Sequence, residues 1–120
     1  MQEEPSVENV FHHHFEAFKN NDLEEVIKDY TDESEIWSPE GKIIGLEGIA
    51  AFFSYVFTLL PKDSTRFELK YFVAKEEKVY ILWNAESPFI NIPFASDCFE
   101  INNGKILWQS TAAHIVPKQA

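Results

Sequence analysis

The residue of this chain that is best placed for chemistry is an aspartate in the segment 95–106. The segment reads as a strand, a tight turn and a second strand, and side chains alternate between the two faces of a strand. Asp97 therefore shares a face with Phe99 and Ile101. A carboxyl group among apolar neighbours is costly to desolvate, so its pKa should rise unless a partner holds it. This makes Asp97 a candidate general acid. The alternative is a carboxylate that is satisfied by hydrogen bonds and fixes the hairpin.

His14 is the second residue that could take part in proton transfer. It falls inside the apolar stripe that helical spacing predicts over residues 7–18, whereas His12 and His13 point away from that stripe. An imidazole exchanges protons near neutral pH, so His14 and Asp97 across a pocket would form an acid–base couple. Their protonation states stay open, because the two groups would titrate as a coupled pair. The alternative for His14 is a core histidine held by a hydrogen bond.

The remaining reactive side chains predict neither a metal site nor a reactive thiol. Consecutive helix residues point about 100° apart, so the run His12-His13-His14 cannot hold one ion. His12 and Glu16 have ligand spacing, but on the solvent side. Cys98 has no histidine or basic residue nearby in sequence to lower its pKa, which is typical of a packed thiol. We therefore expect no metal and no cofactor.

Helices followed by strands would position these residues. Helical spacing and capping residues predict helices over residues 6–20, from Asp22 and over 46–60. Alternation predicts strands over 35–38, 42–45, 66–74 and 78–85 and a final hairpin over 94–115, with a loop or irregular edge over 86–93 because of its two prolines. Strict alternation in the third strand places on one face Phe67, Leu69, Tyr71 and Val73. This order indicates an α+β layer arrangement in a single domain over residues 1–120.

The turn of the final hairpin decides which residues lie beside Asp97. A three-residue loop over 102–104 would put Gln109 and Thr111 on the face of Asp97. A two-residue turn over 103–104 would put there instead Trp108 and Ser110. The local residues leave both registers open.

Composition limits the class of partner. The chain has 120 residues and a formal net charge of −10, which repels phosphate backbones and anionic lipids. We therefore expect no nucleic acid and no membrane partner. Aromatic residues make up 15% of the chain, including 11 phenylalanines, which is enough to fill a core and also line a cavity. A single cysteine and an acidic start without the regions of a signal peptide lead us to expect a cytoplasmic protein.

Four short motifs occur in a characteristic order: Phe18-Lys19-Asn20-Asn21-Asp22-Leu23, Trp37-Ser38-Pro39, Gly45-Leu46-Glu47-Gly48-Ile49, and Asp97-Cys98-Phe99 with Gly104-Lys105-Ile106. In this order the chain resembles the nuclear-transport-factor-2-like fold, and within it the SnoaL-like polyketide cyclases and ketosteroid isomerases. The resemblance implies a cone-shaped α+β fold, in which three N-terminal helices pack on a strongly curved, mostly antiparallel sheet that encloses a pocket. It also implies a homodimer through the sheet, and it favours the three-residue loop of the final hairpin.

The resemblance carries a mechanism over only in part. The catalytic base of the isomerase corresponds to Ser38, and a serine without a base beside it cannot shuttle protons near neutral pH. The phenol and the protonated acid of the isomerase correspond to His14 and Asp97, and its supporting tyrosine corresponds to Phe53. In the cyclases, the acid–base aspartate and its histidine partner correspond to Thr111 and Asp97. Neither catalytic set is complete in this chain.

Two hypotheses about function follow. The first is a pocket that binds an apolar or aromatic ligand carrying a carbonyl or a hydroxyl, with Asp97 and His14 as catalytic residues of an isomerase-, cyclase- or lyase-type proton transfer. The residues expected to bind the ligand are Trp37, Ser38, Phe53, Trp83, Phe99, Gln109 and Thr111. The second is a non-catalytic ligand-binding or dimerisation module. This hypothesis is favoured by Ser38 and Thr111, which stand where the isomerase and the cyclases have catalytic residues.

Overall fold

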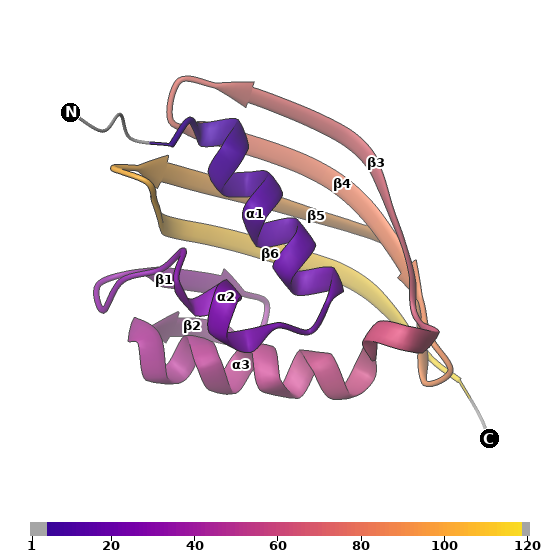
Figure 1. Cartoon of the computed structure of the whole chain (residues 1–120). Coiled ribbons are helices and arrows are strands. Elements are labelled where there is room, and N and C mark those ends of the chain that lie inside the picture. Colours follow the sequence, from indigo (N-terminus) through magenta and orange to yellow (C-terminus); the bar gives the residue numbers. More distant parts are fainter. Residues whose placement is uncertain (1–4, 119–120) are drawn as a thin grey trace.

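The computed structural model describes residues 5–118, in which helices lie on the concave side of a curved sheet (Figure 1). In chain order the elements are α1 (Val7–Lys19), α2 (Leu23–Ile27), β1 (Glu35–Ser38), β2 (Gly41–Ile44), α3 (Gly45–Leu59), the 3₁₀ turn η1 (Lys62–Ser64), β3 (Arg66–Lys75), β4 (Lys78–Glu86), β5 (Ile90–Asn102) and β6 (Lys105–Pro117). This arrangement confirms the predicted α+β class and the three helices packed on the sheet.

The first two helices begin where short polar side chains cap them. The Ser6 hydroxyl accepts a hydrogen bond from the Asn9 amide at 3.0 Å, and the Asp22 carboxylate accepts one from the Glu25 amide at 3.2 Å. These bonds satisfy amide groups that the first helical turn leaves without partners. Both helices therefore start where the sequence predicted, and the apolar stripe of α1 is buried against the sheet.

Within residues 5–118, six strands form one sheet in the order β2-β1-β6-β5-β4-β3. Neighbouring strands are antiparallel except β1 and β6, which run parallel. The two longest strands, β5 and β6, therefore lie in the middle of the sheet. Helix α1 crosses the concave face, and α3 runs along its β1–β2 side (Figure 1).

An aromatic cluster joins α1 to the sheet. The ring of Phe11 is fully buried, and its centroid lies 5.6 Å from that of Phe15, 5.2 Å from that of Phe72 and 5.5 Å from that of Phe99. Buried aromatic rings contribute large apolar areas and favour offset and edge-on contacts. The cluster packs the N-terminal half of α1 firmly onto β3 and β5, and so fixes the helix above the sheet.

Strand β5 begins earlier than the sequence indicates. The predicted loop or irregular edge over residues 86–93 is wrong at its end, because β5 starts at Ile90 and lies between two other strands. Pro93 lies inside the strand at a register shift between Asn91 and Phe94, where β5 has one residue more than β6. Proline has no amide hydrogen for the sheet ladder, and a bulge is one of the places where a strand accommodates it.

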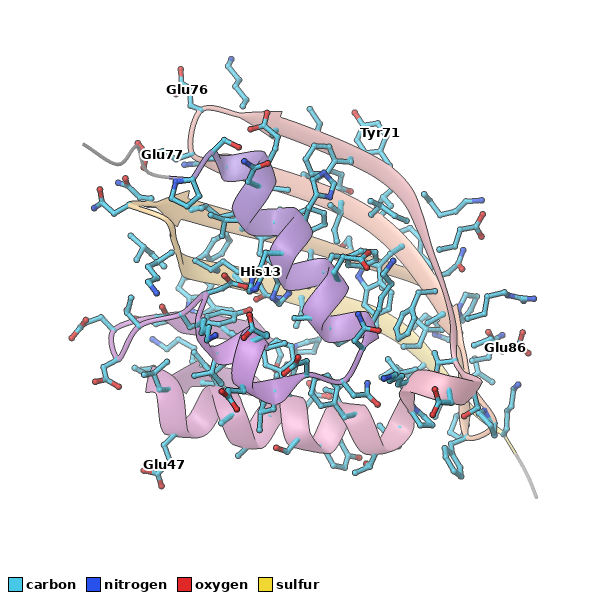
Figure 2. The ribbon with its side chains drawn as sticks, viewed as in Figure 1. His13, Glu47, Tyr71, Glu76, Glu77 and Glu86 are labelled. Atoms are coloured by element: carbon cyan, nitrogen blue, oxygen red, sulfur yellow. The ribbon has the colours of Figure 1, made fainter. Side chains whose placement is uncertain are left out.

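A second register shift changes the faces of β3. The ladder between β3 and β4 shifts by one residue at Lys70. The prediction that Tyr71 and Val73 share the face of Phe67 is therefore wrong. Tyr71 and Val73 are exposed, whereas Phe67 and Phe72 pack on the core. Figure 2 shows the Tyr71 side chain projecting outward from β3, away from the helices.

The turn between β5 and β6 has two residues. Asn102 pairs with Lys105, and the turn residues Asn103 and Gly104 have φ angles of 55° and 74°. Positive φ at both central positions is typical of the type I′ hairpin turn, which asparagine followed by glycine adopts readily. The three-residue loop that the resemblance favoured is therefore wrong.

A bulge nevertheless produces the register that the longer loop implied. Leu107 is an extra residue on β6, because the ladder shifts by one residue at this point. A one-residue shift moves every following side chain to the other face. Thr111 consequently lies directly opposite Asp97, and Gln109 directly opposite Phe99, with their side chains on the inner face.

The side chain of Asn21 links the end of α1 to the end of α3. Its Nδ2 donates to the carbonyl of Leu60 at 3.2 Å, and its Oδ1 accepts from the amide of Lys62 at 2.7 Å. Its φ of 53° lies in the left-handed region, which asparagine tolerates better than most residues. One side chain therefore fixes both helix ends at the same place.

We predict that Asn21→Ala lowers the free energy of unfolding by about 2 kcal/mol, because two hydrogen bonds are lost and alanine is strained at positive φ. Urea unfolding followed by circular dichroism measures the change. Asn20→Ala is the matched control, since the Asn20 side chain donates only to the carbonyl of Glu16 within its own helix and its φ is −90°. Equal losses in the two variants would show that the link between the helices contributes nothing.

Candidate functional site

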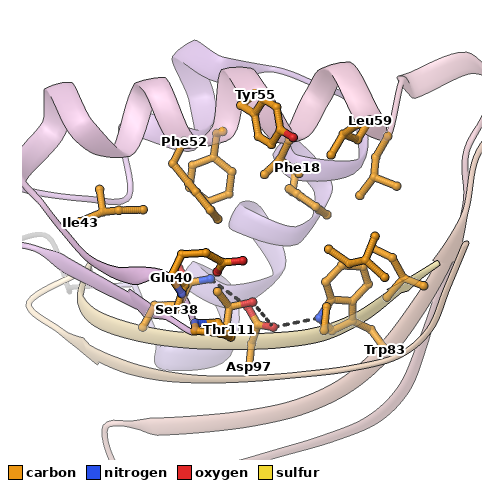
Figure 3. Close-up of a pocket in the computed structure, with 18 of the residues that line it drawn as sticks. Phe18, Ser38, Glu40, Ile43, Phe52, Tyr55, Leu59, Trp83, Asp97 and Thr111 are labelled. Atoms are coloured by element: carbon orange, nitrogen blue, oxygen red, sulfur yellow. Dashed lines mark hydrogen bonds between the residues drawn. The ribbon is translucent and has the colours of Figure 1, made fainter. Parts of the chain in front are cut away.

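A cavity of about 520 Å³ lies between the helices and the inner face of the sheet (Figure 3). Its walls come from α1, the β1–β2 hairpin, α3 and strands β4, β5 and β6. This volume falls in the range of pockets that hold small organic molecules. Most of the lining side chains are apolar or aromatic. The lining residues with ionisable side chains are His14, Glu40, Lys42, Tyr55 and Asp97.

Asp97 lies at the floor of this cavity and is 6% exposed. Its Oδ1 accepts hydrogen bonds from the indole Nε1 of Trp83 at 3.0 Å and from the hydroxyl of Thr111 at 3.1 Å. Its Oδ2 accepts one from the amide Nε2 of Gln109 at 2.9 Å. Three donors from two neighbouring strands therefore hold the carboxyl group in one orientation (Figure 3).

A buried tyrosine sets the orientation of the Gln109 amide. The phenol of Tyr30 donates to Oε1 of Gln109, so the Nε2 of the same amide faces Asp97. Burial raises the pKa of Tyr30 well above its ordinary value, and the charges of Asp97 and Asp29 raise it further. Because the phenol keeps its proton, it must donate, and the amide oxygen is its acceptor. Tyr30, Gln109 and Asp97 thus form one directed chain of hydrogen bonds.

Two opposing effects act on the Asp97 carboxyl group. Burial raises its pKa above the ordinary value, and the hydrogen bonds from Trp83, Gln109 and Thr111 act in the lowering direction. The effect of burial is the larger, because the bonds replace only part of the water that the carboxylate loses. In the absence of a ligand, Asp97 therefore holds its proton more tightly in the folded protein than in the unfolded chain.

His14 is buried in an aromatic cage and stays neutral. It is 4% exposed, and its ring centroid lies 5.6 to 6.4 Å from the ring centroids of Phe99, Tyr30, Phe53 and Phe18. Burial, and to a lesser extent the charge of His13, lowers the pKa of His14 to about 3. Its Nδ1 has no hydrogen-bond partner among residues 5–118. His14 and Asp97 line the same cavity, but the hydrogen bonds of Asp97 run to Trp83, Gln109 and Thr111.

The other predicted residues divide between the cavity and the outer surface. The lining includes Ser38, Phe53, Trp83, Phe99, Gln109 and Thr111. The Ser38 hydroxyl is engaged in the β1–β2 turn, where it donates to the Gly41 carbonyl and accepts from the Glu40 amide, both at 3.2 Å. Ser38 therefore shapes the wall of the cavity through the turn that it stabilises.

Trp37, which the sequence predicted as a ligand-binding residue, does not line the cavity. It is 45% exposed on the outer face, where its ring packs edge-on against Trp108 at 5.4 Å and its Nε1 donates to Glu35. The neighbouring residue on β1, Ile36, is fully buried and occupies the inner position. Alternation along β1 leaves only one of these two residues facing the core.

Two residues of the site were missed at the level of sequence. Tyr30 reads as part of the apolar side of a short helix, and its link to Gln109 joins residues 79 positions apart, so no local pattern reveals it. Glu40 lies in a turn, where an acidic residue ordinarily faces solvent. The hairpin bends over the cavity, and the exposed Glu40 side chain lies on the same side of it as Asp97 and Thr111 (Figure 3).

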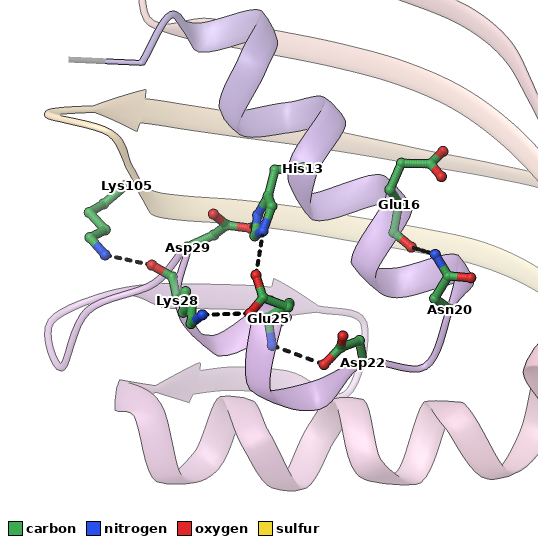
Figure 4. Close-up of polar contacts among 8 residues, drawn as sticks. All are labelled: His13, Glu16, Asn20, Asp22, Glu25, Lys28, Asp29 and Lys105. Atoms are coloured by element: carbon green, nitrogen blue, oxygen red, sulfur yellow. Dashed lines mark hydrogen bonds and ion pairs between the residues drawn. The ribbon is translucent and has the colours of Figure 1, made fainter. Parts of the chain in front are cut away.

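A second group of ionisable side chains lies outside the cavity and joins α1 to α2 (Figure 4). His13 places its Nδ1 2.7 Å from Oδ2 of Asp29 and its Nε2 2.9 Å from Oε1 of Glu25. The hydrogen bonds to Glu25 and Asp29 raise the pKa of His13. This group is a polar contact between the two helices.

Within residues 5–118, no three His, Cys, Asp or Glu side chains are arranged to hold a metal ion. No helix in the same range is both long and apolar enough to cross a bilayer.

A family profile described as the SnoaL-like domain matches residues 11–108. The chain belongs to the SnoaL-like domain family. The match runs from within α1 to the start of β6, and so includes Asp97 and most of the cavity lining. No curated protein matches the chain significantly.

Solved structures show the same fold as this SnoaL-like domain. An NTF2-like protein of unknown function from Cytophaga hutchinsonii is 11% identical, with 95% of each chain covered and a TM-score of 0.75. A Kribbella flavida protein provisionally assigned as a ketosteroid isomerase is 9% identical, with 95% of this chain and 82% of that chain covered and a TM-score of 0.75. A Shewanella putrefaciens protein provisionally assigned as a SnoaL-like polyketide cyclase is 12% identical, with 92% and 81% covered and a TM-score of 0.73. Identities this low show a shared fold alone.

The raised pKa of Asp97 predicts a pH dependence of the stability of this SnoaL-like domain. The folded state binds the Asp97 proton more tightly than the unfolded chain, whose pKa is about 3.9. The resulting stabilisation is fully present below that unfolded pKa and is lost as pH rises through the folded pKa. Asp97→Asn removes this loss, so the stability of the variant relative to the wild type should increase with pH over that range.

Urea unfolding at a series of pH values between 4 and 8 measures this difference. Glu100→Gln is the control, because it removes a carboxylate from the same strand on the outer face of the sheet. Parallel stability curves for the wild type and Asp97→Asn would show that the Asp97 carboxyl group is not perturbed by folding.

Proposed function

We propose that this domain binds an apolar or aromatic small molecule whose one polar group, a carbonyl or a hydroxyl, hydrogen-bonds to Asp97. The observation that carries the proposal is a single buried carboxyl group, oriented by three donors, at the floor of an otherwise apolar cavity of small-molecule size. Pockets of this kind bind through apolar area and obtain orientation from a few fixed polar groups.

The hydrogen bonds of Asp97 leave a place for the ligand. A carboxylate oxygen accepts two hydrogen bonds, and Oδ1 already accepts from Trp83 and Thr111. Oδ2 accepts from Gln109 and keeps a second position. A ligand hydroxyl can donate to that position, and a ligand carbonyl can accept from it when Asp97 is protonated. The ligand would bind with its apolar body against Phe18, Phe53 and the other aromatic rings of the lining.

A second candidate function is a proton-transfer reaction of the isomerase, cyclase or lyase type. The observation that favours it is a pair of carboxyl groups in contrasting environments on one cavity: Asp97 is buried, and Glu40 is exposed at the mouth. In many active sites, two carboxyl groups in different environments take the separate roles of general acid and general base. In this candidate Asp97 donates the proton and Glu40 accepts one, since His14 is too weakly basic. Loss of turnover in Glu40→Gln would support it.

We further propose that a second copy of the chain covers the outer face of the sheet. Two adjacent rows of uncharged side chains cross this face. The first row is Trp37, Ser110, Cys98, Tyr80 and Val73. The second row is Ala112, Ser96, Leu82 and Tyr71. Exposed apolar areas bounded by charged residues are typical of association surfaces. Light scattering on the wild type and on Tyr80→Glu tests this homodimer, which the charged variant should dissociate.

We predict that a bulky side chain at Ala113 blocks ligand binding. Ala113 lines the cavity on β6, whereas its neighbour Ala112 is exposed on the outer face. Ala113→Phe should fill the space beside Asp97. It should therefore weaken the binding of a neutral probe such as 2-naphthol by about tenfold or more. Ala112→Phe should leave the affinity for the probe unchanged. Isothermal calorimetry measures both affinities. If the probe binds the two variants equally, it occupies another surface and the proposed cavity is not the site.

A further inference from the structure

Within the described part of the chain, the buried carboxyl group of Asp97 has no positively charged partner. Among residues 5–118, the ion pairs involve other carboxylates, and no positive charge contributes to the shift in the pKa of Asp97. The imidazole on the same cavity, His14, is neutral. The lysine on the lining, Lys42, lies at the mouth, with its Nζ 5.9 Å from the centroid of the Trp37 ring on the outer face.

The groups around Asp97 nevertheless suit a carboxylate better than a carboxylic acid. The indole nitrogen of Trp83 and the amide nitrogen of Gln109 can only donate, and each faces a different oxygen of Asp97. The phenol of Tyr30 fixes the Gln109 amide, so this donor cannot turn into an acceptor without leaving the phenol unpaired. The donors therefore favour the anion, while burial without a counter-charge disfavours it.

A cation in the cavity would remove this conflict. We propose that the ligand is an apolar or aromatic amine in its protonated form, whose ammonium group donates to the second position on Oδ2 of Asp97. The proposal rests on the proposed function, since it assumes that the cavity binds a small molecule against Asp97. It keeps the cavity and Asp97 of that proposal, and it replaces the neutral carbonyl or hydroxyl of the ligand with a positively charged donor.

The surroundings of the cavity favour a cation independently of Asp97. Aromatic faces attract ammonium groups, and the lining carries seven aromatic side chains other than His14: Phe15, Phe18, Phe52, Phe53, Tyr55, Trp83 and Phe99. The mouth carries the carboxylate of Glu40. The formal net charge of −10 adds a long-range field that concentrates cations around the molecule.

Two matched probes test the proposal. The compounds 2-naphthylmethylamine and 2-naphthylmethanol have the same apolar body, and at neutral pH only the amine carries a charge. Isothermal calorimetry at pH 7 should show about tenfold tighter binding of the amine to the wild type, because its ammonium group adds a charge–charge attraction to the hydrogen bond that both probes can donate to the carboxylate. Asp97→Asn should bring the two affinities together.

Three variants locate the source of the preference. Glu47→Gln removes one negative charge from the exposed surface of α3 and should retain the preference for the amine, which controls for net charge. Ala113→Phe should weaken both probes, which shows that both occupy the cavity. A preference that is lost in Glu40→Gln and kept in Asp97→Asn would overturn the proposal, because the cation would then lie at the mouth.

A measurement on the wild type alone keeps the proposal testable if Asp97→Asn does not fold. The ratio of the two affinities should fall between pH 7 and pH 4, as Asp97 takes up its proton and loses its charge, and a ratio that stays constant would overturn the proposal. The other ionisable groups of the cavity are His14, Glu40, Lys42 and Tyr55, so the series is repeated in Glu40→Gln.

The outcomes separate this inference from the proposed function. If the alcohol binds as tightly as the amine and Ala113→Phe weakens both, the cavity is a ligand site and the amine assignment is wrong. If neither probe binds, or if Ala113→Phe leaves both affinities unchanged, the proposed function fails together with the amine assignment. Tighter binding of the amine that depends on both Ala113 and Asp97 supports the two together.

Discussion

The buried carboxyl group of Asp97 is the constraint on which the inner layer of this domain depends. An aspartate in an apolar interior is unfavourable unless donors replace the water that it loses. The donors come from β4 (Trp83) and β6 (Gln109 and Thr111), and Gln109 is oriented in turn by Tyr30 from the segment after α2. The requirement of one side chain therefore ties three strands and the helical layer together. It also leaves the floor of the cavity with one defined polar point in an apolar surrounding.

The environment of His14 bears directly on the chemistry of the site. A protonated imidazole beside Asp97 would have supplied a counter-charge and a mobile proton. The aromatic rings around His14 instead exclude water and keep it neutral, as its lowered pKa shows. The carboxyl group is left as the one buried ionisable group of the lining with strong hydrogen-bonding partners. Under the proposed function, Asp97 therefore orients the ligand, and in the proton-transfer candidate the acceptor is Glu40 at the mouth.

The sequence predicted the elements and the inward position of Asp97, because these depend on local periodicity. The capping residues Ser6 and Asp22, the α+β order and the face of Asp97 follow from helical spacing and strand alternation. The partners of Asp97 could not be predicted in the same way. The contact between Tyr30 and Gln109 spans 79 residues, and the outward position of Trp37 is decided by the competing burial of Ile36. Contacts between distant elements depend on packing, which no single segment encodes.

Bulges are the deeper reason why the residue faces were hard to predict, and they connect the two faces of the sheet. One extra residue at Leu107 turns Gln109 and Thr111 inward and Trp108 outward, and one at Lys70 turns Phe72 inward and Tyr71 outward. A bulge leaves little trace in the local sequence, yet it inverts the alternation of everything that follows. The same two insertions therefore assemble the donors around Asp97 on the concave side and the uncharged rows on the convex side. Without the bulge at Leu107, Ser110 would lie opposite Asp97. The side chains of Gln109 and Thr111 would then face outward, and the carboxyl group would lose two of its three donors. The chemistry of the cavity and the character of the outer surface are consequently set by one feature of strand geometry.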